Sequence, residues 1–274
     1  MALLAVAFLT GAALAKDRFA YSTHEIPLPN EAGRAWVYLP ENAAGDSLPV
    51  VLIGPAGSHL FDGMDLGDSD RPEHIPYAQA GFAVVSFDIP GMLAQGSSDE
   101  AVVRAAAQFK SGEGGVTNAR AALQLALSQF PRLDRTKIFV AGHSSAATLA
   151  LVLCSKLENL RGCVAYAPDV NPAASRGDVV KVLEPYLPGE AAFIKSVSPI
   201  ELVSGIRSPV LIFNAANDDV VPVAAISDYV RAAEAQKVKV DRIEVPSGGH
   251  YESMIRQGIP AGIAWMRREL GSTR

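Results

Sequence analysis

Short apolar runs alternate with helical patterns along most of this chain. An apolar run of four to eight residues that is bounded by turn residues is typical of a buried strand. Strands are predicted at residues 36–39, 50–53, 83–87, 138–141, 164–167, 210–213 and 242–245. Helices are predicted between them at residues 72–80, 116–129, 145–157, 222–237 and 260–270. The alternation predicts an α/β fold, with a mostly parallel central sheet that helices cover on both faces.

Two segments interrupt this alternation. Residues 91–115 are polar and rich in glycine, with a short helical pattern at residues 101–109. Residues 169–197 lie between two predicted strands and contain three prolines. Insertions into a parallel α/β sheet often lie above the carboxyl ends of the strands, where ligands bind. The second segment is therefore either a small lid over a binding site or a loop that covers the sheet edge.

The predicted strand at residues 138–141 runs directly into a turn of small residues, Gly142-His143-Ser144-Ser145-Ala146. In a G-x-S-x-G turn the serine occupies a strained corner between strand and helix, so its hydroxyl projects from the sheet edge. Gly142 matches the first glycine, and Ala146 replaces the second with a methyl group. The turn indicates Ser144 as a nucleophile, although an ordinary strand-to-helix connection can have the same composition.

Acidic and histidine residues follow two later strands. The strand at 210–213 leads to Asp218 and Asp219, and the strand at 242–245 leads to a glycine loop with His250. A serine hydroxyl needs a histidine to accept its proton, and the histidine needs a carboxylate to orient it. The order serine, aspartate, histidine, with each residue after a strand, therefore predicts a catalytic triad.

Together these features resemble the α/β-hydrolase superfamily, and within it the dienelactone hydrolase and prolyl-oligopeptidase-like group. The resemblance covers nearly the whole chain after residue 15. Besides the serine turn, it is carried by VLIGPAG at 51–57, which looks like a strand and its oxyanion loop, VVSFDIPG at 84–91, and SPI at 198–200. It implies an α/β-hydrolase fold with a catalytic serine, aspartate and histidine.

The resemblance also implies which aspartate is catalytic. In the family the acid stands four residues before the proline of this turn, which is Asp218 before Pro222, and Asp219 is the alternative. Val220 and Val221 are expected to face the core.

The oxyanion donors are expected to be the backbone N–H groups of Ser145 and Ala56. The family usually has a histidine before the glycine of the oxyanion loop, where this chain has Ile53. Candidates for the substrate pocket are Gly57, His59 and His143.

The resemblance implies a serine hydrolase that cleaves a carboxylic ester of a small or short-acyl substrate through an acyl-enzyme. The first alternative is a prolyl-oligopeptidase-like peptidase, and the sequence lacks the large N-terminal propeller with which those enzymes filter peptides. The second is a binding protein that kept the fold and lost activity, which would normally have lost a member of the triad. No metal or organic cofactor is expected.

Residues 1–15 carry no charged side chain, contain an apolar run and end in Ala13-Leu14-Ala15. This pattern predicts a cleavable signal peptide that is too short to span a membrane. We therefore expect a secreted or periplasmic protein without a stable membrane anchor, whose single domain covers residues 16–274. The formal net charge of −5 argues against a nucleic-acid partner, because a phosphate backbone requires a basic face.

Two cysteines, Cys154 and Cys163, are expected to be neighbours, one late in a helix and one early in the next strand. They either form a disulfide or are two small buried side chains. No histidine cluster accompanies them, so a metal site is not expected there.

Residues 62–70 form an acidic stretch directly after the expected oxyanion loop. The spacing of these acids differs from that of a calcium-binding loop. The stretch is either a solvated acidic loop that pairs with Arg71 or a negative rim that favours cationic substrates.

Overall fold

The computed structural model describes residues 18–29, 32–41, 43 and 47–272, so the signal peptide predicted at residues 1–15 lies outside the described residues. Eight strands form one sheet in the order β1-β2-β4-β3-β5-β6-β7-β8. The strands are β1 (Tyr21–Pro27), β2 (Arg34–Pro40), β3 (Leu48–Ile53), β4 (Ala83–Phe87), β5 (Leu133–His143), β6 (Leu160–Tyr166), β7 (Val210–Ala215) and β8 (Val240–Val245). All seven strands predicted from the sequence are present, and β1 is the additional one.

The sheet is mostly parallel, as predicted. Strands β1, β2 and β4 pair antiparallel at one edge, and every other neighbouring pair from β4 to β8 is parallel. Parallel strands present their carboxyl ends at one edge of the sheet. The loops that follow β3, β5, β7 and β8 therefore meet in one region.

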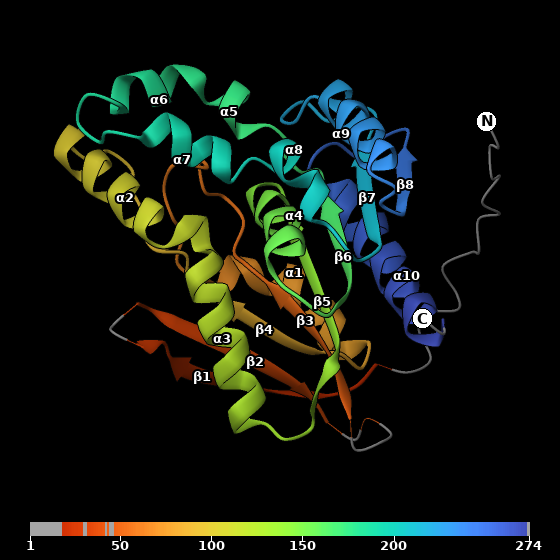
Figure 1. Cartoon of the computed structure of the whole chain (residues 1–274). Helices are drawn as coiled ribbons and strands as arrows, with labels where there is room; N and C mark the ends of the chain where they lie inside the picture. The colour runs from red at the N-terminus through yellow and green to blue at the C-terminus, as the bar shows by residue number, and fades with distance from the viewer. Residues whose placement is uncertain (1–17, 30–31, 42, 44–46, 273–274) are drawn as a thin grey trace.

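Helices cover both faces of the sheet (Figure 1). They are α1 (Arg71–Gln79), α2 (Asp99–Ser111), α3 (Val116–Gln129), α4 (Ser145–Lys156), α5 (Pro172–Ser175), α6 (Gly177–Leu183), α7 (Glu190–Ser196), α8 (Pro199–Leu202), α9 (Val223–Ala235) and α10 (Ile259–Gly271). Helices α3, α4 and α9 pack on one face, while α1 and α10 pack on the other. Side chains along a strand alternate between these two cores, so Val50 and Leu52 face the first while Val51 and Ile53 face the second.

The segment of residues 169–197 is largely helical and contains α5, α6 and α7. Figure 1 shows these helices together at the top of the molecule, next to α2. Helix α2 is tied to α7 by the rings of Phe109 and Phe193, whose centroids are 5.9 Å apart. Lys110 Nζ also donates to the carbonyl oxygen of Pro188 over 2.9 Å. The two segments that interrupt the sequence pattern thus support each other.

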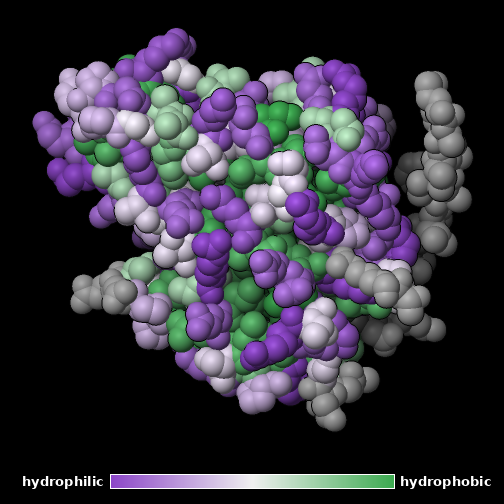
Figure 2. Space-filling model, in the orientation of Figure 1, coloured by the Kyte–Doolittle hydropathy of each residue, from purple (hydrophilic) through white to green (hydrophobic). Residues whose placement is uncertain are grey.

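Hydrophilic residues cover much of the face that carries α2, α6 and α9, with hydrophobic residues visible between them (Figure 2). Among the described residues, no helix has both the length and the apolar composition needed to cross a membrane. Cys154 and Cys163 are both buried and free, which matches the second of the two alternatives for these cysteines.

Candidate active site

The turn after β5 has the strained geometry that its sequence predicts. Ser144 has φ 56° and ψ −122°, a backbone conformation that non-glycine residues rarely adopt. A Cβ atom on Gly142 would lie 2.2 Å from the carbonyl oxygen of Ala146, so only glycine fits there. Ala146 itself is accommodated as a buried residue. The turn therefore places Ser144 between the carboxyl end of β5 and the first turn of α4.

The loops after β7 and β8 bring Asp218 and His250 together. Nδ1 of His250 lies 2.8 Å from Oδ2 of Asp218. The Asp218 side chain is 1% exposed and that of His250 is 14% exposed, so water barely competes for this hydrogen bond. Because Nδ1 donates to the carboxylate, the other ring nitrogen, Nε2, is left as an acceptor.

Asp218 also organises its own turn. Its Oδ1 accepts the backbone N–H groups of Val220 and Val221 over 2.9 and 3.0 Å. Burial alone raises the pKa of this carboxyl, but the Val221 amide, His250 and the Val220 amide together hold the pKa below its ordinary value. Asp219, in contrast, is exposed.

The expectation that Val220 and Val221 both face the core is wrong for Val220. Val221 is buried, but Val220 is 62% exposed. The carboxylate of Asp218 draws both amides toward itself, and this tight turn directs the Val220 side chain outward.

The His250 loop depends on two glycines with positive φ, Gly248 at 115° and Gly249 at 62°. The backbone N–H of Gly249 donates to Oδ1 of Asn217 over 3.0 Å. Asn217 was not among the predicted site residues, and its position directly before Asp218 is the only sequence signal for it. The acid turn and the histidine loop are therefore joined by two adjacent side chains.

Nε2 of His250 is buried and has no hydrogen-bond partner among the described residues. Next to it, the ring of His143, the residue before Ser144, lies with its centroid 4.5 Å from that of His250. The atom that would accept a proton from Ser144 is thus unoccupied. Such hydrogen bonds are often long or misaligned until a substrate is bound.

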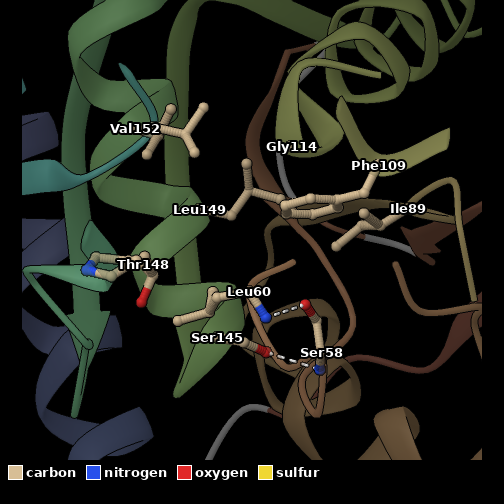
Figure 3. Close-up of a pocket in the computed structure, with 11 residues that line it drawn as sticks. Ser58, Leu60, Ile89, Phe109, Gly114, Ser145, Thr148, Leu149 and Val152 are labelled. Carbon is tan, nitrogen blue, oxygen red and sulfur yellow. Dashed lines mark hydrogen bonds between the residues drawn. The ribbon is translucent and has the colours of Figure 1, made fainter. Parts of the chain in front are cut away.

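The loop after β3 approaches the start of α4, but its amides do not point into open space. The N–H groups of Gly57 and Ser58 both donate to Oγ of Ser145, over 3.0 and 3.1 Å, and Figure 3 shows the second of these bonds. The N–H of Ala56 is near the carboxylate of Asp70 and lowers its pKa. The N–H of Ser145 belongs to the first residue of α4, where no intrahelical acceptor exists.

A cavity of about 260 Å³ lies over Ser144. The residues that line it are Ser58, Leu60, Ser144, Ser145, Asp169, Ser175, Arg176, Val220, Val221 and Pro222. A narrower space of about 20 Å³ shares Ser58, Leu60 and Ser145 with it. There Thr148, Leu149 and Val152 of α4 face Phe109 and Ile89 (Figure 3).

Three residues were expected to form the substrate pocket, and none of them lines either of these two spaces. Gly57 is engaged with Ser145 through its backbone. His59 has a side chain that is 64% exposed, and its Nδ1 lies 2.8 Å from Oδ2 of Asp62. His143 is buried, and its Nε2 lies 3.1 Å from the carbonyl oxygen of His250.

The acidic stretch at residues 62–70 is only partly solvated. Asp62 and Asp70 are buried, whereas Asp65 and Asp68 are exposed. Asp68 pairs with Nε of Arg71 over 2.7 Å, which is the expected ion pair. Within the described part of the chain, no group of three or more histidine, cysteine or acidic side chains is arranged to hold a metal ion.

Comparison with known proteins supports this description of the fold. The sequence matches the prolyl oligopeptidase family over residues 70–273. Acylaminoacyl peptidase from Pyrococcus horikoshii is 14% identical with a TM-score of 0.72, over 94% of this chain and 43% of that one. Esterase B from Lactobacillus rhamnosis is 13% identical with a TM-score of 0.69, over 92% and 85%. A Klebsiella pneumoniae protein named as a candidate dienelactone hydrolase is 15% identical with a TM-score of 0.64, over 91% and 99%.

At these identities the similar structures establish the fold. The family match, together with that fold, confirms the resemblance to the α/β-hydrolase superfamily and its dienelactone hydrolase and prolyl-oligopeptidase-like group. The chain spans less than half the length of the acylaminoacyl peptidases that it matches. No curated protein matches the chain in sequence.

Proposed function

We propose that this chain, which belongs to the prolyl oligopeptidase family, is a serine hydrolase with Ser144, Asp218 and His250 as its catalytic triad. The proposal rests mainly on the contacts of the two ring nitrogens of His250. Its Nδ1 is held by a buried carboxylate at 2.8 Å, and its Nε2 is free beside the strained serine turn. This is the arrangement that a general base for a serine nucleophile requires.

In the proposed mechanism, Nε2 of His250 accepts the proton of Ser144 Oγ as the oxygen attacks the substrate carbonyl carbon. Asp218 steadies the imidazolium that forms. The leaving group then takes the proton from His250, which leaves an acyl group on Ser144. A water molecule, deprotonated by His250, then attacks the acyl carbon, and His250 returns the proton to Ser144 Oγ as the acid is released. Asp218 remains ionised throughout, which agrees with its lowered pKa.

We propose an ester of a small or short-chain acid as the substrate. The supporting observation is the size of the space around Ser144, about 260 Å³ with a narrow apolar extension of about 20 Å³. A short acyl chain fits such a space, whereas a long acyl chain or an extended peptide would have to leave it. The second candidate is peptide hydrolysis, which the family match favours.

We further propose that residues 169–197 act as a lid. Ser175 and Arg176 line the cavity, and Nε of Arg176 donates to the carbonyl oxygen of His59 over 3.0 Å. This bond joins the segment to the loop after β3, so its release would open the cavity. The signal peptide at residues 1–15 and export from the cytoplasm are proposals that rest on the sequence pattern alone.

Labelling with a fluorophosphonate, together with hydrolysis of p-nitrophenyl acetate, tests the proposed function. The parent protein should be labelled and active, and Ser144→Ala should be neither while it keeps its circular dichroism spectrum. Ser155→Ala changes a serine at the far end of the same helix and serves as the matched control. Undiminished labelling of Ser144→Ala would place the nucleophile elsewhere. Peptide p-nitroanilides, assayed in parallel, distinguish the two substrate classes.

A further inference from the structure

Ser145 lies at the point where the loop after β3 meets the serine turn. Its side chain is buried, with 7% of the residue exposed. Its Oγ accepts two backbone hydrogen bonds, from Gly57 at 3.0 Å and from Ser58 at 3.1 Å. Two N–H groups that converge on one oxygen are the arrangement expected around an oxyanion, but here the oxygen belongs to the protein.

The backbone N–H groups of this loop near Ser145 are therefore already engaged within the protein and do not point at a substrate oxyanion. The N–H groups of Gly57 and Ser58 are bonded to Ser145, and that of Ala56 is near the Asp70 carboxylate, whose pKa it lowers. A tetrahedral intermediate is usually stabilised by two donors. The backbone N–H of Ser145, at the start of α4, supplies one of them, and the second must come from another group.

The hydroxyl hydrogen of Ser145 is available for this role. A serine hydroxyl offers one donor and two acceptor lone pairs, and the two amides occupy both lone pairs. Among the described residues, no acceptor is bonded to the hydroxyl hydrogen. Ser145 lines both the larger cavity and the narrow space beside it, so the hydrogen can point into the substrate site. Accepting two hydrogen bonds polarises the hydroxyl and strengthens it as a donor.

We propose that the Ser145 hydroxyl is the second oxyanion donor, acting beside the backbone N–H of the same residue. The loop after β3 does not touch the oxyanion in this arrangement, and its two amides hold the hydroxyl in place. No proton is transferred, because the hydroxyl donates a hydrogen bond that strengthens as the carbonyl oxygen becomes negative. The proposal rests on the proposed function, since it requires that Ser144 attack a carbonyl carbon.

Ser145→Thr and Ser145→Val form the decisive pair of variants. The two side chains have nearly the same shape, so any effect of added bulk is common to both, and only Thr keeps the hydroxyl. We expect the kcat for p-nitrophenyl acetate to be about 10²- to 10³-fold lower in the Val variant than in the Thr variant, with KM changed much less. Ser145→Ala provides a second variant without added bulk, and its kcat should be lower than that of the parent by a similar factor.

A thiono ester, in which sulfur replaces the carbonyl oxygen, distinguishes two roles of the Ser145 hydroxyl. The hydroxyl either donates to the oxyanion or only holds the loop after β3 in place. Sulfur is a weak hydrogen-bond acceptor, so a lost donor matters little for the thiono ester. If Ser145 donates to the oxyanion, the ratio of the ester rate to the thiono ester rate should fall at least about 30-fold in the Val and Ala variants. An unchanged ratio would mean that the hydroxyl only holds the loop, and the proposal would be overturned.

A definite result is also expected if the loop amides, and not the Ser145 hydroxyl, bind the oxyanion. If the Ser145 side chain merely fills an oxyanion site that the amides of Gly57 and Ser58 later use, its removal would leave kcat unchanged or raise it. That result would overturn the proposal as well. The proposed function is tested separately, because it requires only an active parent and an inactive Ser144→Ala variant. Ser155→Ala removes a hydroxyl that donates to the Val152 carbonyl oxygen and lines neither of the two spaces, so it should behave as the parent.

Discussion

Nδ1 of His143 lies 3.3 Å from Oε1 of Glu73, and both side chains are buried. The opposite nitrogen of the same ring lies 3.1 Å from the carbonyl oxygen of His250, so Nε2 must carry the proton to donate to it. The imidazole of His143 therefore lies between Glu73 in α1 and the His250 loop. His143 also directly precedes Ser144 in the chain, so this pair lies beside both Ser144 and the His250 loop.

If His143 carries a proton on both ring nitrogens, Glu73→Ala should lower the free energy of unfolding by about 3 kcal/mol, because the buried imidazolium then loses its carboxylate partner. The kcat should fall as well, because the His250 carbonyl loses a fixed donor. Chemical denaturation and ester hydrolysis measure the two effects. Glu252→Ala, which removes an exposed carboxylate that pairs with Arg256, is the control and should stay within about 0.5 kcal/mol of the parent. Equal stabilities for the two variants would contradict this role for Glu73.

Gly142 and Ala146 allow a sharp test of the serine turn. Gly142→Ala would place a methyl group 2.2 Å from a backbone oxygen, so we expect a misfolded or inactive protein. Ala146→Gly restores the second glycine of the usual pattern and should keep activity, at a cost of about 0.5–1 kcal/mol for a glycine in a helix. Soluble yield, thermal denaturation and ester hydrolysis compare the pair. A stable and active Gly142→Ala variant would show that the turn is less constrained than this geometry requires.

Asp70 should make stability depend on pH in the direction opposite to most carboxylates. Burial, with smaller effects of the Glu73 and Asp88 charges, raises the pKa of Asp70 to about 6 despite the amides of Gly67 and Ala56, which lower it. Between about pH 4 and pH 6 the folded protein therefore holds a proton that the unfolded chain has lost, so this group's contribution falls as pH rises.

The variant Asp70→Asn removes that dependence. Its unfolding free energy relative to the parent should rise by up to about 3 kcal/mol from pH 4 to pH 7, as judged by urea denaturation. Asp68→Asn, at an exposed carboxylate two residues earlier, should leave the pH profile nearly unchanged. A flat difference for Asp70→Asn would mean that Asp70 is ionised across this range.

The acyl chain accepted at the site should be short. The narrow space beside Ser145 is closed by Phe109 and Leu149 (Figure 3), so acetyl and butyryl esters should react faster than palmitoyl esters. Phe109→Ala should shift the preference toward longer chains by enlarging that space. Phe193→Ala removes the aromatic partner of Phe109 without opening the space directly, and it controls for loosened packing of the lid. A parent enzyme that prefers palmitoyl esters would refute the assignment.

Much of the architecture could be predicted from the sequence, because buried parallel strands leave continuous apolar runs. Strand β1 was missed for the converse reason. It is an edge strand in which Ile26 is the one buried residue, so it has no apolar run to detect. Its position follows from antiparallel pairing with β2, which is a property of the folded chain.

The site could be predicted where chain order and backbone strain determine it, and not where side chains from distant segments meet. The positions of Ser144, Asp218 and His250 follow from turns after strands. The approach of the Ala56 amide to Asp70, and that of Glu73 to His143, bring together residues that are far apart in the sequence. No local sequence pattern indicates these contacts. His143 was therefore expected to line the pocket, whereas it is buried and lines neither space.

The last prediction separates two adjacent aspartates. Both follow β7, but the carboxylate of Asp218 lies 2.8 Å from Nδ1 of His250, whereas Asp219 is exposed. Asp218 also accepts two backbone amides, so its side chain cannot turn away without breaking the loop. Asp218→Asn keeps an oxygen for those amides but removes the charge that stabilises the imidazolium, and it can hold His250 in the wrong tautomer. In a serine triad this change lowers kcat by about 10⁴-fold.

Asp219→Asn changes an exposed charge near the start of α9, where an acid contributes about 0.3–1 kcal/mol, so turnover should stay within a few-fold of the parent. Steady-state hydrolysis of p-nitrophenyl acetate by the two variants, each checked for folding by circular dichroism, makes the comparison with one substitution as the control for the other. Because the two residues share a loop, a general disturbance of that loop would slow both variants. Only a loss of turnover that is confined to Asp218→Asn fits the proposed triad. The reverse pattern would make Asp219 the triad acid and shift the register of this turn by one residue.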